Sequence, residues 1–91
     1  MKRKVLLIED NEQNRYLVTF LLERNGYQVT PAEDGPDGID AATAQVFDLI
    51  LLDIQLPTMD GYAVARALRR KPALDGVPIV IQWDGDYWHG Y

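Results

Sequence analysis

The sequence predicts an α/β domain built on a parallel sheet that carries helices on both faces. Short apolar runs alternate with segments of helical periodicity in the order β-α-β-α-β-α-β. The strongest run, residues 49–52, is nearly continuous, as expected for a strand buried on both sides. Helices of roughly 10–12 residues between the strands suit the right-handed crossovers that parallel strands require. At 91 residues, the chain is expected to form one small domain.

Composition excludes several classes of protein. The apolar fraction of 47% is that of an ordinary globular protein, and the net charge of −5 argues against a basic nucleic-acid-binding face. The absence of cysteine removes disulfides, thiolate metal sites and cysteine nucleophiles. Only four apolar residues follow the basic start, too few for a signal peptide or a membrane span. We therefore expect a soluble, cytoplasmic protein without nucleic-acid or membrane partners.

The first strand is predicted at residues 5–8, and the helix after it begins at a cap formed by Asp10 or Asn11. Asn25-Gly26 ends this helix, because glycine suits the left-handed position that follows a helix. The apolar residues expected on its inner face are Leu17, Phe20 and Leu21, joined by Val18 and Leu22. The residues expected to face water are Glu12, Arg15, Thr19 and Glu23.

The second strand is predicted at residues 27–30, closed by Pro31. Asp34-Gly35-Pro36 opens the second helix, with Pro36 at a position that needs no amide hydrogen. Its inner face is expected to consist of Ile39, Ala42 and Val46.

The third strand is predicted at residues 49–53, and the third helix after it is capped by Asp60. That helix ends before Lys71-Pro72, because proline disfavours helical geometry in the residue that precedes it. The fourth strand is predicted at residues 77–81. The residues expected to pack inward from the third helix are Ala63, Val64, Ala67 and Leu68.

Three carboxylates are predicted to gather at one end of the sheet. Glu9 and Asp10 follow the first strand, and Asp53 ends the third. If these strands are neighbours, about 4.8 Å apart, the charges repel and one carboxyl tends to stay protonated. A hard cation such as Mg²⁺ relieves this repulsion, and an aspartate beside Mg²⁺ can form an aspartyl phosphate. From spacing alone, a helix cap and a turn explain the same residues equally well.

The letters of these segments resemble one protein family. Residues 4–11 (Lys-Val-Leu-Leu-Ile-Glu-Asp-Asn) and 48–57 (Asp-Leu-Ile-Leu-Leu-Asp-Ile-Gln-Leu-Pro), together with Met59-Asp60-Gly61, closely resemble the response-regulator receiver domains of two-component signalling. The resemblance covers about residues 3–81. It implies a doubly wound, flavodoxin-like fold in which the four parallel strands have the order 2-1-3-4.

The resemblance also implies a site and a partner. By it, Asp53 is the phosphoacceptor, and Mg²⁺ is held by Glu9, Asp10, Asp53 and the backbone carbonyl of Gln55. The phosphoryl donor would be a phosphohistidine on a histidine kinase or phosphotransfer protein. The metal would neutralise charge on the phosphoryl group during transfer.

The resemblance breaks after the fourth strand. Trp83 stands where the family carries a Thr or Ser that contacts the phosphoryl group. The family's fifth strand, its last two helices and its phosphate-pairing Lys have no counterpart in these 91 residues, and Lys71-Pro72 lies too early to substitute. We therefore divide the chain into a truncated receiver-like domain, residues 1–81, and an atypical tail, residues 82–91. Phosphotransfer and switching are expected to be impaired.

The tail has two interpretations. Asp84-Gly85 between aromatic flanks is a two-residue hairpin signal, which predicts that residues 86–89 pair antiparallel with the fourth strand. The other interpretation is strand pairing between two chains, which makes the protein an interaction or structural fragment that dimerises through its fourth-strand edge and tail.

The enzyme-class alternative is a metal-dependent hydrolase, and it is the less favoured reading. Its metal ligands would be Asp84, Asp86 and His89, or the cluster formed by Glu9, Asp10 and Asp53. Turn-forming aspartates and an exposed histidine explain the tail residues more simply.

Overall fold

The computed structural model describes residues 2–53, 60–83 and 87–90. Their strands form one sheet in the order β2-β1-β3-β4-β5. The first four are parallel, and β5 runs antiparallel to β4. The strands are β1 (Lys4–Ile8), β2 (Gln28–Ala32), β3 (Leu49–Asp53), β4 (Ile79–Trp83) and β5 (Tyr87–Gly90). The predicted order of the parallel strands, 2-1-3-4, is confirmed.

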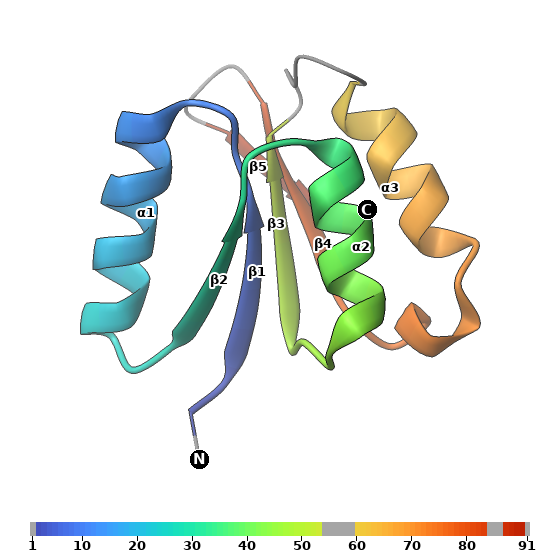
Figure 1. Cartoon of the computed structure of the whole chain (residues 1–91), viewed down its shortest axis with the longest axis horizontal. Helices are drawn as coiled ribbons and strands as arrows, with labels where there is room; N and C mark the ends of the chain where they lie inside the picture. The colour runs from blue at the N-terminus through green and yellow to red at the C-terminus, as the bar shows by residue number, and fades with distance from the viewer. Residues whose placement is uncertain (1, 54–59, 84–86, 91) are drawn as a thin grey trace.

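Helices lie on both faces of the sheet, as predicted (Figure 1). In the described ranges, α1 (Glu12–Arg24) covers β1 and β2 on one face, while α2 (Gly35–Ala44) and α3 (Gly61–Arg69) cover the other. A short 3-10 helix, η1 (Pro72–Leu74), leads from α3 to β4. Among these helices, none is long and apolar enough to cross a membrane.

Each α-helix starts at a side chain that accepts a hydrogen bond from the first turn. The oxygen Oδ1 of Asn11 accepts from the backbone amide of Asn14 at 2.9 Å. Asp34 and Asp60 cap α2 and α3 in the same way, at 2.9 and 2.8 Å. The predicted caps are confirmed, with Asn11 rather than Asp10 at the first helix. At the other end of α1, Gly26 has a φ of 91°, the left-handed conformation predicted there.

Two hydrophobic cores flank the sheet, because successive strand residues point to opposite faces. The core under α2 and α3 is the larger of the two. Its strand residues are Leu6, Ile8, Ala32, Ile50, Leu52, Ile79 and Ile81. Val5, Leu7 and Leu51 face the other way and pack against residues that include Val18 and Leu22 of α1. β1 and β3 are therefore buried on both sides, and the end of each strand has a fixed position.

The predicted inner face of α1 is confirmed for Val18 and Leu22, which pack against the core, and is wrong for its other three residues. Leu17, Phe20 and Leu21 are 53%, 48% and 49% exposed, whereas Arg15 and Thr19, expected in water, are half-buried. Six of the seven residues from 16 to 22 are apolar, so periodicity alone does not distinguish the two sides of this helix.

Three boundaries also differ from the prediction. α2 ends at Ala44, so Val46 lies beyond it and is 80% exposed, while Phe47 is buried in its place. β2 includes Pro31, which an edge strand tolerates because proline lacks an amide hydrogen. β4 spans Ile79–Trp83, so it begins and ends two residues later than the predicted range 77–81.

The tail strand forms within the same chain. Trp83 pairs with Tyr87 and Val80 with Gly90, so β5 covers the edge of β4. This confirms the antiparallel tail strand, although β5 spans residues 87–90 and the prediction was 86–89. Asp84 and Gly85, the predicted turn, lie outside the described residues. Pairing of this edge between two chains stays a prediction.

Gly38 in α2 lies directly against the side chain of Ile8 in β1. A Cβ atom on Gly38 would collide with Cδ1 of Ile8 and would lie 2.6 Å from its Cγ1. Ile8 is completely buried in the larger core, so its side chain has little room to move aside. A side chain at position 38 would therefore push α2 away from β1.

We expect Gly38→Ala to destabilise the protein. Overpacking costs about 1–3 kcal/mol, and the better helix propensity of alanine offsets up to about 1 kcal/mol of this. Urea unfolding should show a net loss, while Gly76→Ala, with nothing within 4 Å of the added Cβ, should leave stability nearly unchanged. Adding Ile8→Val should recover part of the loss. A Gly38→Ala protein as stable as the parent would contradict the close contact.

Candidate functional site

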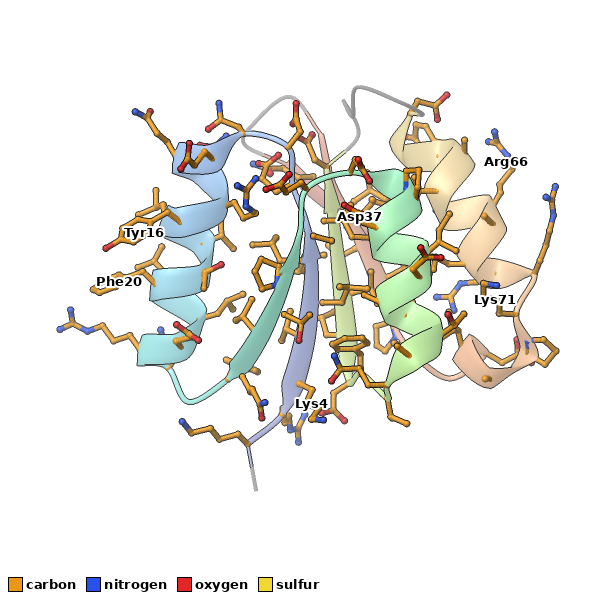
Figure 2. All side chains as sticks on the ribbon, viewed as in Figure 1. Lys4, Tyr16, Phe20, Asp37, Arg66 and Lys71 are labelled. Atoms are coloured by element: carbon orange, nitrogen blue, oxygen red, sulfur yellow. The ribbon has the colours of Figure 1, made fainter. Side chains whose placement is uncertain are left out.

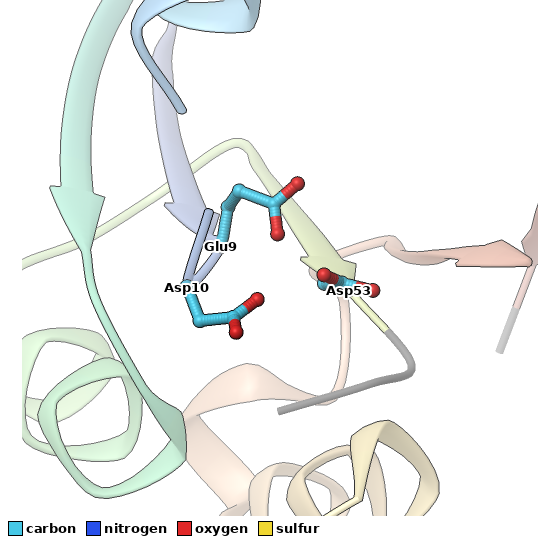
Figure 3. A group of neighbouring side chains, drawn as sticks. All are labelled: Glu9, Asp10 and Asp53. Carbon is cyan, nitrogen blue, oxygen red and sulfur yellow. The ribbon is translucent and has the colours of Figure 1, made fainter. Parts of the chain in front are cut away.

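The ends of β1 and β3 bring three carboxylates together. Ile8 pairs with Leu52 in parallel register, so the residues that follow, Glu9 and Asp53, lie side by side. Asp10 is next along the chain. One carboxylate oxygen from each of the three residues lies within 4.8 Å of the others. Figure 3 shows the three side chains directed toward a common space at this end of the sheet.

The three carboxyls differ in their exposure to water. Glu9 is 2% exposed, Asp53 is half-buried, and Asp10 is exposed. The cluster therefore has a buried floor and a side that is open to solvent. A ligand that enters from that side meets Asp10 and Asp53 before Glu9.

The proximity of the carboxyls perturbs Glu9. Burial, a hydrogen bond with Asp53 and the charge of Asp53 together raise the pKa of Glu9 from its ordinary value of 4.5 to about 8, and burial has the largest effect. The backbone amide of Asn11 acts the opposite way, and the charge of Asp10 adds a smaller upward effect. In the absence of a cation, Glu9 is therefore protonated at neutral pH.

The donor set fits a hard divalent cation. The oxygen Oε2 of Glu9 is buried and has no hydrogen-bond partner in the structure. A buried oxygen without a partner costs free energy unless a ligand satisfies it. Carboxylate oxygens, one of them buried and two accessible, are the ligands that Mg²⁺ prefers when it also keeps several waters.

Arg15 forms hydrogen bonds with the backbone of the acidic segment Glu9-Asp10, a role that the sequence did not predict. Its Nη1 donates to the backbone oxygens of Glu9 at 2.9 Å and Asp10 at 3.3 Å. Its Nη2 lies 3.8 Å from Oε1 of Glu33. The signal was its position in the first turn of the helix after Glu9-Asp10, where a long side chain reaches back to the strand end. Arg15 fixes the main chain that carries two of the three carboxylates.

On its other side, Asp53 pairs with Gln82 of β4. Trp83 is the next residue and the last of β4, so its backbone lies at the same end of the sheet as the carboxylates. Gln55, the fourth predicted ligand, lies outside the described residues, and so do Asp84 and Asp86 of the alternative metal site. Within the described part of the chain, Glu9, Asp10 and Asp53 are the acidic cluster with metal-binding spacing.

Comparison with known proteins identifies relatives of this chain. A family profile described as the response regulator receiver domain matches residues 5–82. Protein PilH of Pseudomonas aeruginosa is 32% identical over 78 residues, which are 86% of this chain and 64% of PilH. The polar-differentiation response regulator DivK of Brucella anthropi is 36% identical over 80 residues, which are 88% of this chain and 65% of DivK. The chain thus spans just under two thirds of the length of these relatives.

Solved structures give the same result. The chemotaxis response regulator CheY4 of Vibrio cholerae superposes with a TM-score of 0.87 at 31% identity, over 89% of this chain and 68% of that one. The receiver domain of sensor histidine kinase PA1611 from Pseudomonas aeruginosa has a TM-score of 0.88 at 34% identity, over 93% of this chain and 70% of that one. That structure holds a magnesium ion coordinated in its active-site cleft. The predicted family and the flavodoxin-like fold are confirmed.

The raised pKa of Glu9 predicts how the stability of the metal-free protein depends on pH. Below pH 4.5, Glu9 is protonated in both the folded and unfolded states, and its contribution to stability is fully present. Between pH 4.5 and about 8, the unfolded chain releases the proton while the folded protein keeps it, so the free energy of unfolding falls as the pH rises. Above that range the contribution is lost.

Glu9→Gln should remove this pH dependence, because glutamine resembles the protonated acid and does not titrate. Urea unfolding with a chelator present should show the variant to be more stable than the parent at alkaline pH, by on the order of a few kcal/mol. Glu23→Gln, the same change at an exposed position, should keep the slope of the parent. An unchanged slope in Glu9→Gln would show that Glu9 is not the titrating group.

Proposed function

Since the chain belongs to the response regulator receiver domains of two-component signalling, we propose that it binds Mg²⁺ through Glu9, Asp10 and Asp53 and accepts a phosphoryl group on Asp53. The observation that best supports this proposal is the cluster itself. Its three carboxylate oxygens lie within 4.8 Å of one another, and the buried Oε2 of Glu9 has no hydrogen-bond partner. The magnesium ion in the related PA1611 receiver domain supports the same metal. By the family resemblance, the backbone carbonyl of Gln55 completes the protein ligands.

The three acids have different tasks. Bound Mg²⁺ would supply charge neutralisation on the transferring phosphoryl group. Glu9, buried at the end of β1, would have to give up its proton to serve as a ligand, and Asp10, which is exposed, would be a second ligand. Asp53, at the end of β3, presents a carboxylate oxygen to phosphorus; as the new P–O bond forms, the P–N bond of the donor breaks and its electron pair stays on the imidazole nitrogen.

We propose a phosphohistidine of a histidine kinase or phosphotransfer protein as the donor, on the strength of the family alone. The same comparison with the family supports slow phosphotransfer and weak switching by these 91 residues. Trp83 has no hydroxyl to donate to a phosphoryl oxygen, so the phosphorylated form lacks one of the contacts that family members use. The Mg²⁺ ligands do not depend on that residue. Metal binding is therefore expected to be retained better than phosphotransfer.

Acetyl phosphate tests the phosphoacceptor. With Mg²⁺ present, the intact mass should increase by one phosphoryl group, and a chelator or Asp53→Asn should abolish the increase. Asp40→Asn, which removes an exposed acid of α2, is the matched control and should be labelled like the parent. Beryllofluoride, a phosphoryl mimic, gives a second reading through an Mg²⁺-dependent change in tryptophan fluorescence.

Two results would separate the parts of the proposal. If Asp53→Asn were labelled as efficiently as the parent, Asp53 would not be the phosphoacceptor. Calorimetry could show that the parent binds Mg²⁺ while acetyl phosphate does not label it and beryllofluoride does not change its fluorescence. That result would support the metal site and contradict the phosphoacceptor assignment.

A further inference from the structure

Arg15 is a cation of α1 that lies against the acidic end of β1. Its side chain is only 18% exposed, although arginine usually keeps its charged group in water unless a partner holds it. Tyr16, the next residue of α1, is 73% exposed and points away from the sheet (Figure 2). The first half of α1 thus directs one side chain to the solvent and its neighbour to the end of the strand.

Arg15 takes over from the sheet as the partner of the main chain just past β1. The amide of Glu9 still donates to the carbonyl of Ala32 at 3.0 Å, but β1 itself ends at Ile8. Beyond that point, the carbonyls of Glu9 and Asp10 accept hydrogen bonds from Nη1 of Arg15, at 2.9 and 3.3 Å. A guanidinium carries five donors in one rigid plane, so a single side chain can hold both carbonyls at once.

The position of Arg15 is itself fixed by the helix that carries it. Its backbone amide donates to the carbonyl of Asn11 at 2.8 Å, and the side chain of Asn11 caps the same turn. The ion pair with Glu33 adds little, because its two atoms are 3.8 Å apart and the Glu33 side chain is 76% exposed. The bonds to the two carbonyls are therefore the main effect of Arg15 on its surroundings.

We propose that Arg15 is a positioning residue of the Mg²⁺ site. By holding the carbonyls of Glu9 and Asp10, it sets the direction in which their carboxylates enter the site. It rests on the proposed function, since the metal is the same, but it gives Arg15 no contact with the metal or the phosphoryl group. Mg²⁺ demands near-ideal octahedral geometry, so its affinity is sensitive to the placement of its ligands.

Removal of the Arg15 charge distinguishes three roles by the sign of the effect. If charge alone mattered, removal of a nearby cation would tighten Mg²⁺ binding, because like charges repel. If Arg15 only stabilised the fold, its loss would lower the free energy of unfolding and leave the Mg²⁺ affinity of the folded protein unchanged. Positioning predicts weaker Mg²⁺ binding by the folded protein, even though a repulsive charge has been removed.

Calorimetry of Mg²⁺ binding to the whole chain tests this role. Arg15→Met keeps an apolar stem without donors and should weaken the affinity by about 10–100-fold, the usual loss when a group that orients metal ligands is removed. Arg15→Lys should recover part of the loss, since an ammonium keeps donors but lacks the planar fork. Arg24→Met, the same change at an exposed position in the last turn of α1, is the matched control and should bind as the parent does.

Urea unfolding with a chelator present shows beforehand which variants are folded. An affinity of Arg15→Met equal to or tighter than that of the parent would overturn the positioning role and leave the metal site in place. If Arg15→Met did not fold, Arg15→Lys would decide, and binding as tight as that of the parent would then overturn the role. Failure of the proposed function gives a different result, because the parent itself would show no Mg²⁺ binding.

Discussion

The parallel pairing of β1 with β3 is the constraint on which the site depends. Because Ile8 pairs with Leu52, both strands end at the same level and their next polar side chains meet. Three acids within 4.8 Å repel one another, and the repulsion is balanced by apolar side chains buried on both faces of the two strands. The sheet thus holds three acids close together, and without a cation their repulsion is reduced because Glu9 keeps its proton at neutral pH.

The segment after β1 is fixed by polar contacts as well as by packing. The amide of Glu9 donates to the carbonyl of Ala32 at 3.0 Å, Arg15 donates to the carbonyls of Glu9 and Asp10, and Asn11 caps α1. These bonds act on the main chain and do not use the carboxylate oxygens. The result is a site whose backbone is rigid and whose electrostatics are unfavourable until a cation arrives. Proteins commonly accept such a local loss of stability at functional positions.

Those parts of the fold that follow from strong local patterns were predictable from the sequence. The apolar runs predicted β1 and β3, and the acids at the ends of these strands predicted the cluster. Asp34 and Asp60 predicted where α2 and α3 begin. The orientation of α1 was not predictable, because apolar residues surround that helix and only the location of the sheet decides which of them are covered. Gly38 could not be recognised either, since nothing in its neighbours along the chain indicates that Ile8 lies against it.

Long-range contacts account for what remained hidden at the site. The position of Arg15 is compatible with exposure to water, and its role emerges only when α1 packs beside the end of β1. The high pKa of Glu9 likewise results from burial and from Asp53, which is distant in sequence and adjacent in space. Residue types alone indicated which groups might bind a metal, whereas the differences between the three acids come from tertiary structure.

Because of Pro31, the two edge strands of the sheet, β2 and β5, differ in the backbone hydrogen bonds that they can donate outward. Gln28 donates its amide to Arg3 and Ala32 offers its carbonyl to Glu9, so in parallel pairing the nitrogens of the odd-numbered residues of β2 point outward. Pro31 is one of these residues, and its ring nitrogen has no hydrogen to donate to an added strand. The margin at β5 carries no proline within Tyr87–Gly90. The addition of a further strand is therefore expected to be less favourable at β2 than at β5, because a strand paired with β2 would lack the hydrogen bond at Pro31.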